Sequence, residues 1–240
     1  MRVFSQRVFG LALLPLVAAS SLAESPTEFI STEMIVERMS QARQEHHAQL
    51  RPYSVIRAYK LFGKEGLPPK SEITTGINYT PPSGQSYSVL RVEGSHLGEI
   101  IVRKILESEQ TLLAKRSASA ISTANYAFHL IREETLDGVR CYVLELRPHR
   151  NEANLLRGRV WVDSGRYLIR RVEGEPAKSP SWWVRDIHIA LVFDEVEGMW
   201  LQTGFRSTAK VRLLGEHTVV SRDLEYKVDR LNAALSAQSR

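Results

Sequence analysis

Apolar and polar residues alternate along most of the second half of the chain. In residues 201–213 the odd-numbered positions are mostly apolar or small, whereas the even-numbered positions are mostly polar. In residues 184–193 the four positions Ile187, Ile189, Leu191 and Phe193 fall on one side. A period of two residues predicts strands with one face in the core and the other in water. We therefore expect an antiparallel sheet over this region.

The first half adds further strands and two helices to this pattern. Alternation over 53–62, 70–80 and 84–94 predicts three strands, with a turn at the Pro-Pro-Ser-Gly run. Helical spacing is found in 31–46, where Ser31 or Thr32 can cap the helix, and again in 97–115. About ten strands without strand–helix–strand alternation predict a mainly β (α+β) meander, and a sheet this wide must curl or split.

The amino terminus has the features of an export signal. Residues 1–7 contain two arginines and no acid, and an apolar run follows in which Ser21 and Ala23 precede a cleavage point. We expect residues 1–23 to be removed, leaving one domain at 24–230 and a disordered tail at 231–240. We therefore expect the mature protein to be exported.

Composition argues against several classes of function. Loss of the two signal arginines lowers the formal net charge from +5 to +3, and the remaining cations are interleaved with acids, so no nucleic acid is expected as a partner. Cys141 is the single cysteine, and the histidines lack metal-ligand spacing. Catalytic and nucleotide-binding motifs are absent from the sequence. We therefore expect no enzyme activity, no metal and no cofactor.

Three side chains leave two interpretations open. In the Trp182-Trp183 pair one indole should face the core and the other outward, to cover an edge of the sheet or to contact a partner or membrane surface. Arg43 lies along the first helix, where a solvent-facing role competes with a functional one.

The order of the predicted elements resembles the periplasmic lipoprotein-carrier family, which includes LolA, LolB and outer-membrane lipoprotein-sorting proteins. The resemblance is most specific in GRVWVDSGRYLIRRVEGEPAKSP, residues 158–180, which is followed by a hairpin with the turn DEVEGMWL. It implies a strongly curved antiparallel sheet that forms an incomplete barrel, with helices over its concave side. None of that family's functional residues can be placed here.

The resemblance further implies an apolar cavity that shields acyl chains. We expect this cavity to be lined by inward-facing residues of the sheet and the second helix: Leu144, Leu146, Ile187, Ile189, Leu191, Phe193, Leu201, Phe205, Ile101 and Ile105. The function implied is a monomeric carrier, located in the periplasm of a Gram-negative type of cell, that moves lipid or lipoprotein acyl chains toward the outer membrane. A donor or acceptor protein at a membrane surface would be its partner. A binding or sensing module of the same fold is the alternative, and an exported enzyme is the third possibility.

Overall fold

The computed structural model describes residues 30–63, 67–81, 84–180, 182, 184–213 and 215–228. Three helices are present in this part of the chain, at Thr32–Ala48 (α1), His96–Ala114 (α2) and Arg116–Ser119 (α3). The ten strands are β1 (Tyr53–Phe62), β2 (Ser71–Thr80), β3 (Gly84–Gly94), β4 (Tyr126–Leu136), β5 (Val139–Pro148), β6 (Leu156–Asp163), β7 (Ile169–Pro176), β8 (Val184–Val196), β9 (Met199–Val211) and β10 (Gly215–Val228). The predicted signal sequence and tail lie outside the described residues.

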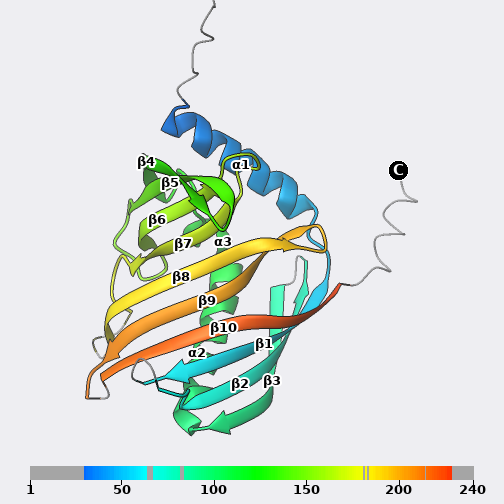
Figure 1. The fold of residues 1–240 in the computed structure, drawn as a ribbon, viewed down its shortest axis with the longest axis vertical. Coiled ribbons are helices and arrows are strands. Elements are labelled where there is room, and N and C mark those ends of the chain that lie inside the picture. The colour runs from blue at the N-terminus through cyan, green and yellow to red at the C-terminus, as the bar shows by residue number, and fades with distance from the viewer. Residues whose placement is uncertain are drawn as a thin grey trace, which may run out of the picture.

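All ten strands belong to one antiparallel sheet in the order β3-β2-β1-β10-β9-β8-β7-β6-β5-β4 (Figure 1). The chain builds two meanders, β1 to β3 and β4 to β10, which are joined where β1 pairs with β10. Within the described residues the end strands β3 and β4 each pair with one neighbour only and not with each other, so the sheet is not closed into a barrel. The predicted mainly β fold with an incomplete barrel is confirmed.

One face of the sheet carries the helices, and the strand register shows that both long helices lie on it. Directly paired residues of neighbouring strands point to the same side. A single row of such pairs crosses the whole sheet: Val92, Ile73, Tyr59, Ser221, Phe205, Leu191, Val172, Val160, Leu144 and Leu130. We call the side that contains this row the inner face.

Two apolar clusters hold the helices against this face at opposite ends of the sheet. Helix α1 begins at an N-cap where the Ser31 hydroxyl accepts a hydrogen bond from the Met34 amide at 3.2 Å. Its buried residues Ile35, Val36 and Met39 pack with buried residues of β4 to β7. Val102 and Leu106 of α2 pack with β1, β2 and β10 instead. Figure 1 shows α1 lying along the β4–β7 end, away from β1, β2 and β3.

Two tight hairpins fix the register of the meander. The β4–β5 turn places Asp137 and Gly138 at φ 49° and 81°, and the β8–β9 turn places Glu197 and Gly198 at φ 50° and 77°. Two consecutive residues with positive φ form the turn whose twist matches that of the flanking strands. The sequence analysis placed the turn of the second hairpin in DEVEGMWL, and the structure confirms it.

The Trp-apolar-Asp segment of β6 has a structural explanation. Trp161 lies on the outer face, where it packs with Cys141 and with Val143, its register partner on β5. The carboxylate of Asp163 accepts hydrogen bonds from the amides of Gly165 and Arg166, both at 2.9 Å. The tryptophan covers the outer face and the aspartate closes the next turn, so both residues serve the fold.

Candidate functional site

The middle of the inner face is apolar but incompletely covered. Leu191 and Phe205 pair directly across β8 and β9, and both are only half-buried. Ile189 lies one pair further along, opposite Ser207, and packs against neither of the two clusters that hold the helices. Helix α1 contacts β4, and α2 lies closest to β1, β2 and β3. The strands between them thus present apolar side chains that no helix buries fully.

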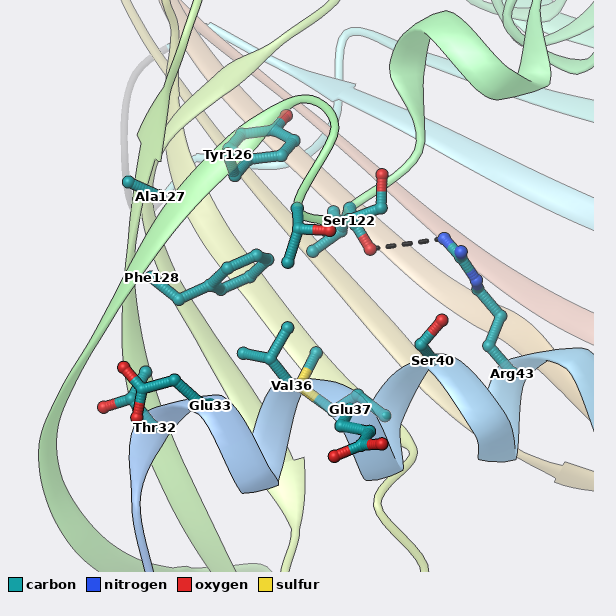
Figure 2. A pocket seen from close by; sticks show the side chains of 13 residues that line it. Thr32, Glu33, Val36, Glu37, Ser40, Arg43, Ser122, Tyr126, Ala127 and Phe128 are labelled. Atoms are coloured by element: carbon teal, nitrogen blue, oxygen red, sulfur yellow. Dashed lines mark hydrogen bonds between the residues drawn. The ribbon is translucent and has the colours of Figure 1, made fainter.

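A cavity of about 410 Å³ lies beside α1 at one end of this face. Its apolar wall is formed by Val36, Met39, Ile121, Tyr126 and Phe128. Figure 2 shows Val36 on α1 pointing toward Phe128 on β4. Polar side chains of α1 lie along the helix side of the cavity, and residues of the α3–β4 segment and β4 complete the lining: Thr32, Glu33, Glu37, Ser40 and Arg43, with Ser122, Thr123 and Ala127. The cavity is therefore amphipathic, with an apolar interior and polar groups along the helix.

The segment between α3 and β4 borders this cavity and is held by specific polar contacts. Arg43 donates a hydrogen bond from Nη1 to the carbonyl of Ile121 at 3.2 Å (Figure 2). The buried Asn125 donates to the carbonyls of Ser117 and Ala120 at 2.9 and 2.8 Å, and Arg150 donates to its Oδ1 at 2.9 Å. Arg43 is an exposed residue of α1 whose side chain bonds to the backbone of the cavity wall, so this contact holds the segment and assigns Arg43 no further role.

A second cavity of about 300 Å³ lies between the carboxyl-terminal half of α2 and the inner face. Apolar and aromatic residues provide much of its lining: Tyr53, Val55, Ile77, Leu112 and Leu113. Ser119 and Ala120 also line it, while the adjoining Ile121 lines the first cavity. The segment after α2 thus separates two cavities on the same side of the sheet.

A buried group of charges lies in the wall of this second cavity. Arg57 on β1 is 7% exposed and contacts Asp223 on β10 from Nε to Oδ1 at 2.5 Å and from Nη2 to Oδ2 at 3.2 Å. Its Nη1 lies 3.5 Å from the Oε2 of Glu109 on α2. The hydroxyl of Tyr226 also donates to Asp223. One guanidinium therefore faces two carboxylates, one from the sheet and one from the helix.

Burial and charge shift the pKa values in this group. Burial raises the pKa of the Glu109 carboxyl, and the neighbouring Arg57 opposes this shift only in part. Burial opposes the charge on Arg57, yet its hydrogen bonds with Asp223 raise the Arg57 pKa above its ordinary range. Burial also raises the pKa of Tyr53 to about 12. The tyrosines therefore stay neutral, and burial disfavours the charged form of Glu109.

The structure places the ten predicted lining residues in two different settings. Leu144, Leu146 and Leu201 are buried, the first two with no exposed surface, and the first two belong to the α1 cluster. The remaining residues are half-buried: Ile101, Ile105, Ile187, Ile189, Leu191, Phe193 and Phe205. Leu191 and Phe193 pack against the α1 cluster, and Ile101, Ile105 and Phe205 against the α2 cluster. None of the ten lines either cavity described above.

Sequence reasoning missed the buried charges. Arg57 stands in the inward row of β1 between Val55 and Tyr59, where the alternation calls for an apolar side chain. A charge at such a position signals a buried pair, so Arg57 could have been noticed. Its partners Asp223 and Glu109 come from distant elements, and no sequence spacing connects them.

Other candidate features have plain outcomes. Within the described ranges no group of three or more His, Cys, Asp or Glu could hold a metal ion. None of the helices described is both long and apolar enough to cross a membrane. Trp182 is 65% exposed, which agrees with the expectation that one indole of the pair faces outward, and Trp183 lies outside the described residues.

Comparison with solved structures finds similar folds at low identity. A domain of a putative outer membrane lipoprotein-sorting protein from Vibrio parahaemolyticus is 13% identical, with a TM-score of 0.41 over 85% of this chain and 100% of that one. A DUF1329 family protein from Desulfovibrio piger is 15% identical, with a TM-score of 0.41 over 83% and 93%. A LolA superfamily protein from Nitrosomonas europaea is 15% identical, with a TM-score of 0.38 over 86% and 97%.

Proteins described as lipoprotein-sorting and LolA superfamily are among these structural matches, each at a TM-score below 0.5. At these identities the likeness concerns the fold and carries nothing about ligand or activity. A family model described only as an uncharacterized protein matches residues 117–209. No curated protein sequence matches the chain.

Proposed function

We propose that this protein binds the acyl chain of a lipid or lipoprotein against the inner face of its sheet and carries it through the periplasm without chemical change. The observation that supports the proposal is the apolar row from Leu130 to Phe205, which crosses six strands. The members of the row on β4 to β7 pack under α1, whereas Leu191 on β8 and Phe205 on β9 are only half-buried. A ligand on β8 and β9 would bury surface that the folded chain leaves partly in water.

The magnitude of this burial is sufficient for a carrier. Burying one methylene contributes about 0.8 kcal/mol. About ten methylenes would contribute roughly 8 kcal/mol, which corresponds to a micromolar dissociation constant before the costs of association. The two cavities of about 410 and about 300 Å³ are not lined by Leu191 or Phe205, but each has a volume in the range of roughly 300–1,000 Å³ typical of small-molecule sites and could receive part of a ligand. Binding of this strength holds an acyl chain and still permits its release.

The polar groups around the cavities are suited to orientation rather than to catalysis. Arg57 is engaged by Asp223 and Glu109, and Arg43 is engaged by the carbonyl of Ile121. No nucleophile is positioned against a base in either lining. The proposed role therefore needs burial and release, and no reaction step.

Native mass spectrometry of the protein purified from a periplasmic extract without detergent tests the proposal. We expect a bound species of lipid or lipopeptide mass that is lost on denaturation. A protein that remains empty after incubation with phospholipid, with a fatty acid and with an acylated peptide would contradict the carrier function.

A binding or sensing module that recognises a protein is a second candidate, favoured by the open edges of the sheet. The edge strand β3 carries Leu90, which is 56% exposed, and β4 carries Ile131, which is 42% exposed. An edge strand offers main-chain groups to which an extended peptide can add. In this case the native mass spectrum would show a stoichiometric polypeptide and no lipid.

A further inference from the structure

The corner of the sheet where β8 begins and β9 ends carries a small group of exposed residues. Val184 pairs with Val211, so Trp182 precedes and Leu213 follows the same end of the β8–β9 ladder. The guanidinium of Arg212 lies over the Trp182 ring, with Cζ 5.6 Å from the ring centroid. We call Trp182, Arg212 and Leu213 the tip.

Leu213 is exposed to solvent in a backbone conformation that is unfavourable for leucine. Its side chain is 92% exposed, and its backbone has φ 72°, in the left-handed region. A leucine in this region is strained by about 1 kcal/mol or more, whereas glycine or asparagine tolerates it. Within the described chain the strain is not repaid by burial of the leucine. Such an arrangement is understandable when the side chain is buried by something outside the molecule.

The other members of the tip suit a membrane surface. Trp182 is 65% exposed, and an indole has an apolar body and one hydrogen-bond donor, as the interfacial region of a bilayer favours. Three cations lie in or next to the tip, namely Arg185, Lys210 and Arg212, against the two carboxylates of Asp186 and Glu216. Lys210 is paired with Asp186 at 3.0 Å. The region therefore carries a net positive charge around an apolar protrusion.

The tip also lies at the end of the proposed binding face. Phe205, Ser207, Ala209 and Val211 occupy every second position of β9, and the register with β10 is unbroken between 204 and 211. These side chains therefore share the inner face, and all four are half-buried. They form a strip of apolar and small residues that runs from Phe205 toward Leu213.

We propose that the tip docks the protein onto an anionic lipid bilayer, with Leu213 and Trp182 in the interface and the surrounding cations against the lipid headgroups. This deepens the proposed function, because docking would bring the end of the acyl-binding strip to the membrane. The docking itself does not require that a ligand be bound.

Partitioning of the full-length mature protein onto sedimented vesicles tests the proposal. The vesicles contain phosphatidylcholine alone or an equal mixture with phosphatidylglycerol, at about 0.1 M and about 1 M salt, where the screening length falls from about 10 to about 3 Å. We expect binding to the anionic vesicles and its loss at high salt. Leu213→Asn should weaken partitioning about tenfold, and Arg212→Gln about fivefold.

Leu67→Asn is the matched control, because Leu67 is also a loop leucine, 55% exposed, outside the tip. Leu213→Asn relieves the backbone strain, so the variant should fold at least as well as the parent. Failure of the parent to bind anionic vesicles, equal binding to both vesicle types, or equal losses in Leu213→Asn and Leu67→Asn would each overturn the proposal.

Binding of a fluorescent fatty acid in vesicle-free solution separates the two proposals. We expect Leu213→Asn to keep this binding while it loses the membrane. Vesicle binding by a protein that takes up no fatty acid would contradict the carrier function alone. Fatty-acid binding by a protein whose tip variants partition normally would contradict the docking alone.

Discussion

Arg57 on β1 and Asp223 on β10 form a two-point ion pair inside the protein, at the junction of the two meanders. The register between β1 and β10 shifts next to Arg57, because Ile56 pairs with Glu225 and Arg57 with Asp223. Leu224 is the extra residue of this bulge and is 60% exposed. A bulge redirects neighbouring side chains, and here it leaves Asp223 against the guanidinium. The side chains of Arg57 and Asp223 are 8% and 3% exposed.

Breaking this pair should be costly. Asp223→Ala leaves the Arg57 charge buried with Glu109 as its remaining ionic partner, and loss of one partner of a buried pair typically costs about 3–5 kcal/mol. We expect a decrease of that size in the free energy of unfolding, measured with urea. Glu72→Ala is the control. The Lys60–Glu72 ion pair, with N and O atoms 3.0 Å apart, has side chains that are nearly half exposed, so it should contribute only about 0–1 kcal/mol to the free energy of unfolding. Equal effects of the two substitutions would contradict a special role for the buried pair.

The pH dependence of stability should include a contribution from Glu109. Burial raises the pKa of this carboxyl in the folded protein above its ordinary value of 4.5. The folded state therefore holds the proton more tightly than the unfolded state, and this group favours folding most below pH 4.5. Its contribution declines as the pH rises through the folded-state pKa. Glu109→Gln should remove this decline from a series of urea titrations at different pH values.

Glu99→Gln provides a control of opposite sign. A hydrogen bond from Arg103 lowers the pKa of the Glu99 carboxyl in the folded state. The contribution of Glu99 is therefore present above its unfolded pKa and is lost as the pH falls. If Glu109→Gln changed the pH profile in the direction expected for Glu99→Gln, the assignment of Glu109 as a burial-shifted acid would be wrong.

Two of the ten predicted lining residues distinguish the core from the open part of the inner face. Leu144 is fully buried in the α1 cluster, so Leu144→Ala should lower the free energy of unfolding by about 2–5 kcal/mol. Ile189 is half-buried outside both clusters, so Ile189→Ala should cost clearly less. Chemical denaturation of both variants measures the difference. A larger loss for Ile189→Ala would show that the middle of the face is packed core.

Ligand binding should depend on the inner side of β8 and not on its outer side. Ile189→Asn places an amide on the proposed binding face and should weaken binding of a fluorescent fatty acid about tenfold. Val192→Asn, on the same strand, is the control. Val192 is 43% exposed and pairs with Gly204, which is adjacent to the inward Phe205, so Val192 points to the outer face. Equal affinities of the two variants would place the ligand elsewhere.

The single cysteine should be unreactive in the folded protein. Cys141 has no exposed surface, and burial raises the pKa of its thiol. Because the thiolate is the reactive species, labelling with a thiol reagent should be slow in buffer and complete in denaturant. Rapid labelling of the native protein would show that the outer cluster around Trp161 opens readily.

The pattern of apolar residues determined the elements of this protein almost by itself. Alternation in residues 184–193 and helical spacing in residues 97–115 are local consequences of which side chains meet the core, so the sequence alone reveals them. The residue types at Asp137-Gly138 and Glu197-Gly198 also indicate turns, because few residues other than glycine tolerate a positive φ. The same alternation predicted that Leu191 and Phe205 face inward, and the register pairs them directly.

The tertiary structure alone decided which of these inward residues are covered by the protein's own helices. Leu144 and Ile189 look alike in sequence, but α1 packs at the β4 end of the sheet and leaves β8 half-covered. Arg57, Asp223 and Glu109 meet only because β10 returns to pair with β1 while α2 crosses the same face. Such contacts depend on long-range packing, in which a residue's partners are set by the path of the whole chain and not by its neighbours in sequence.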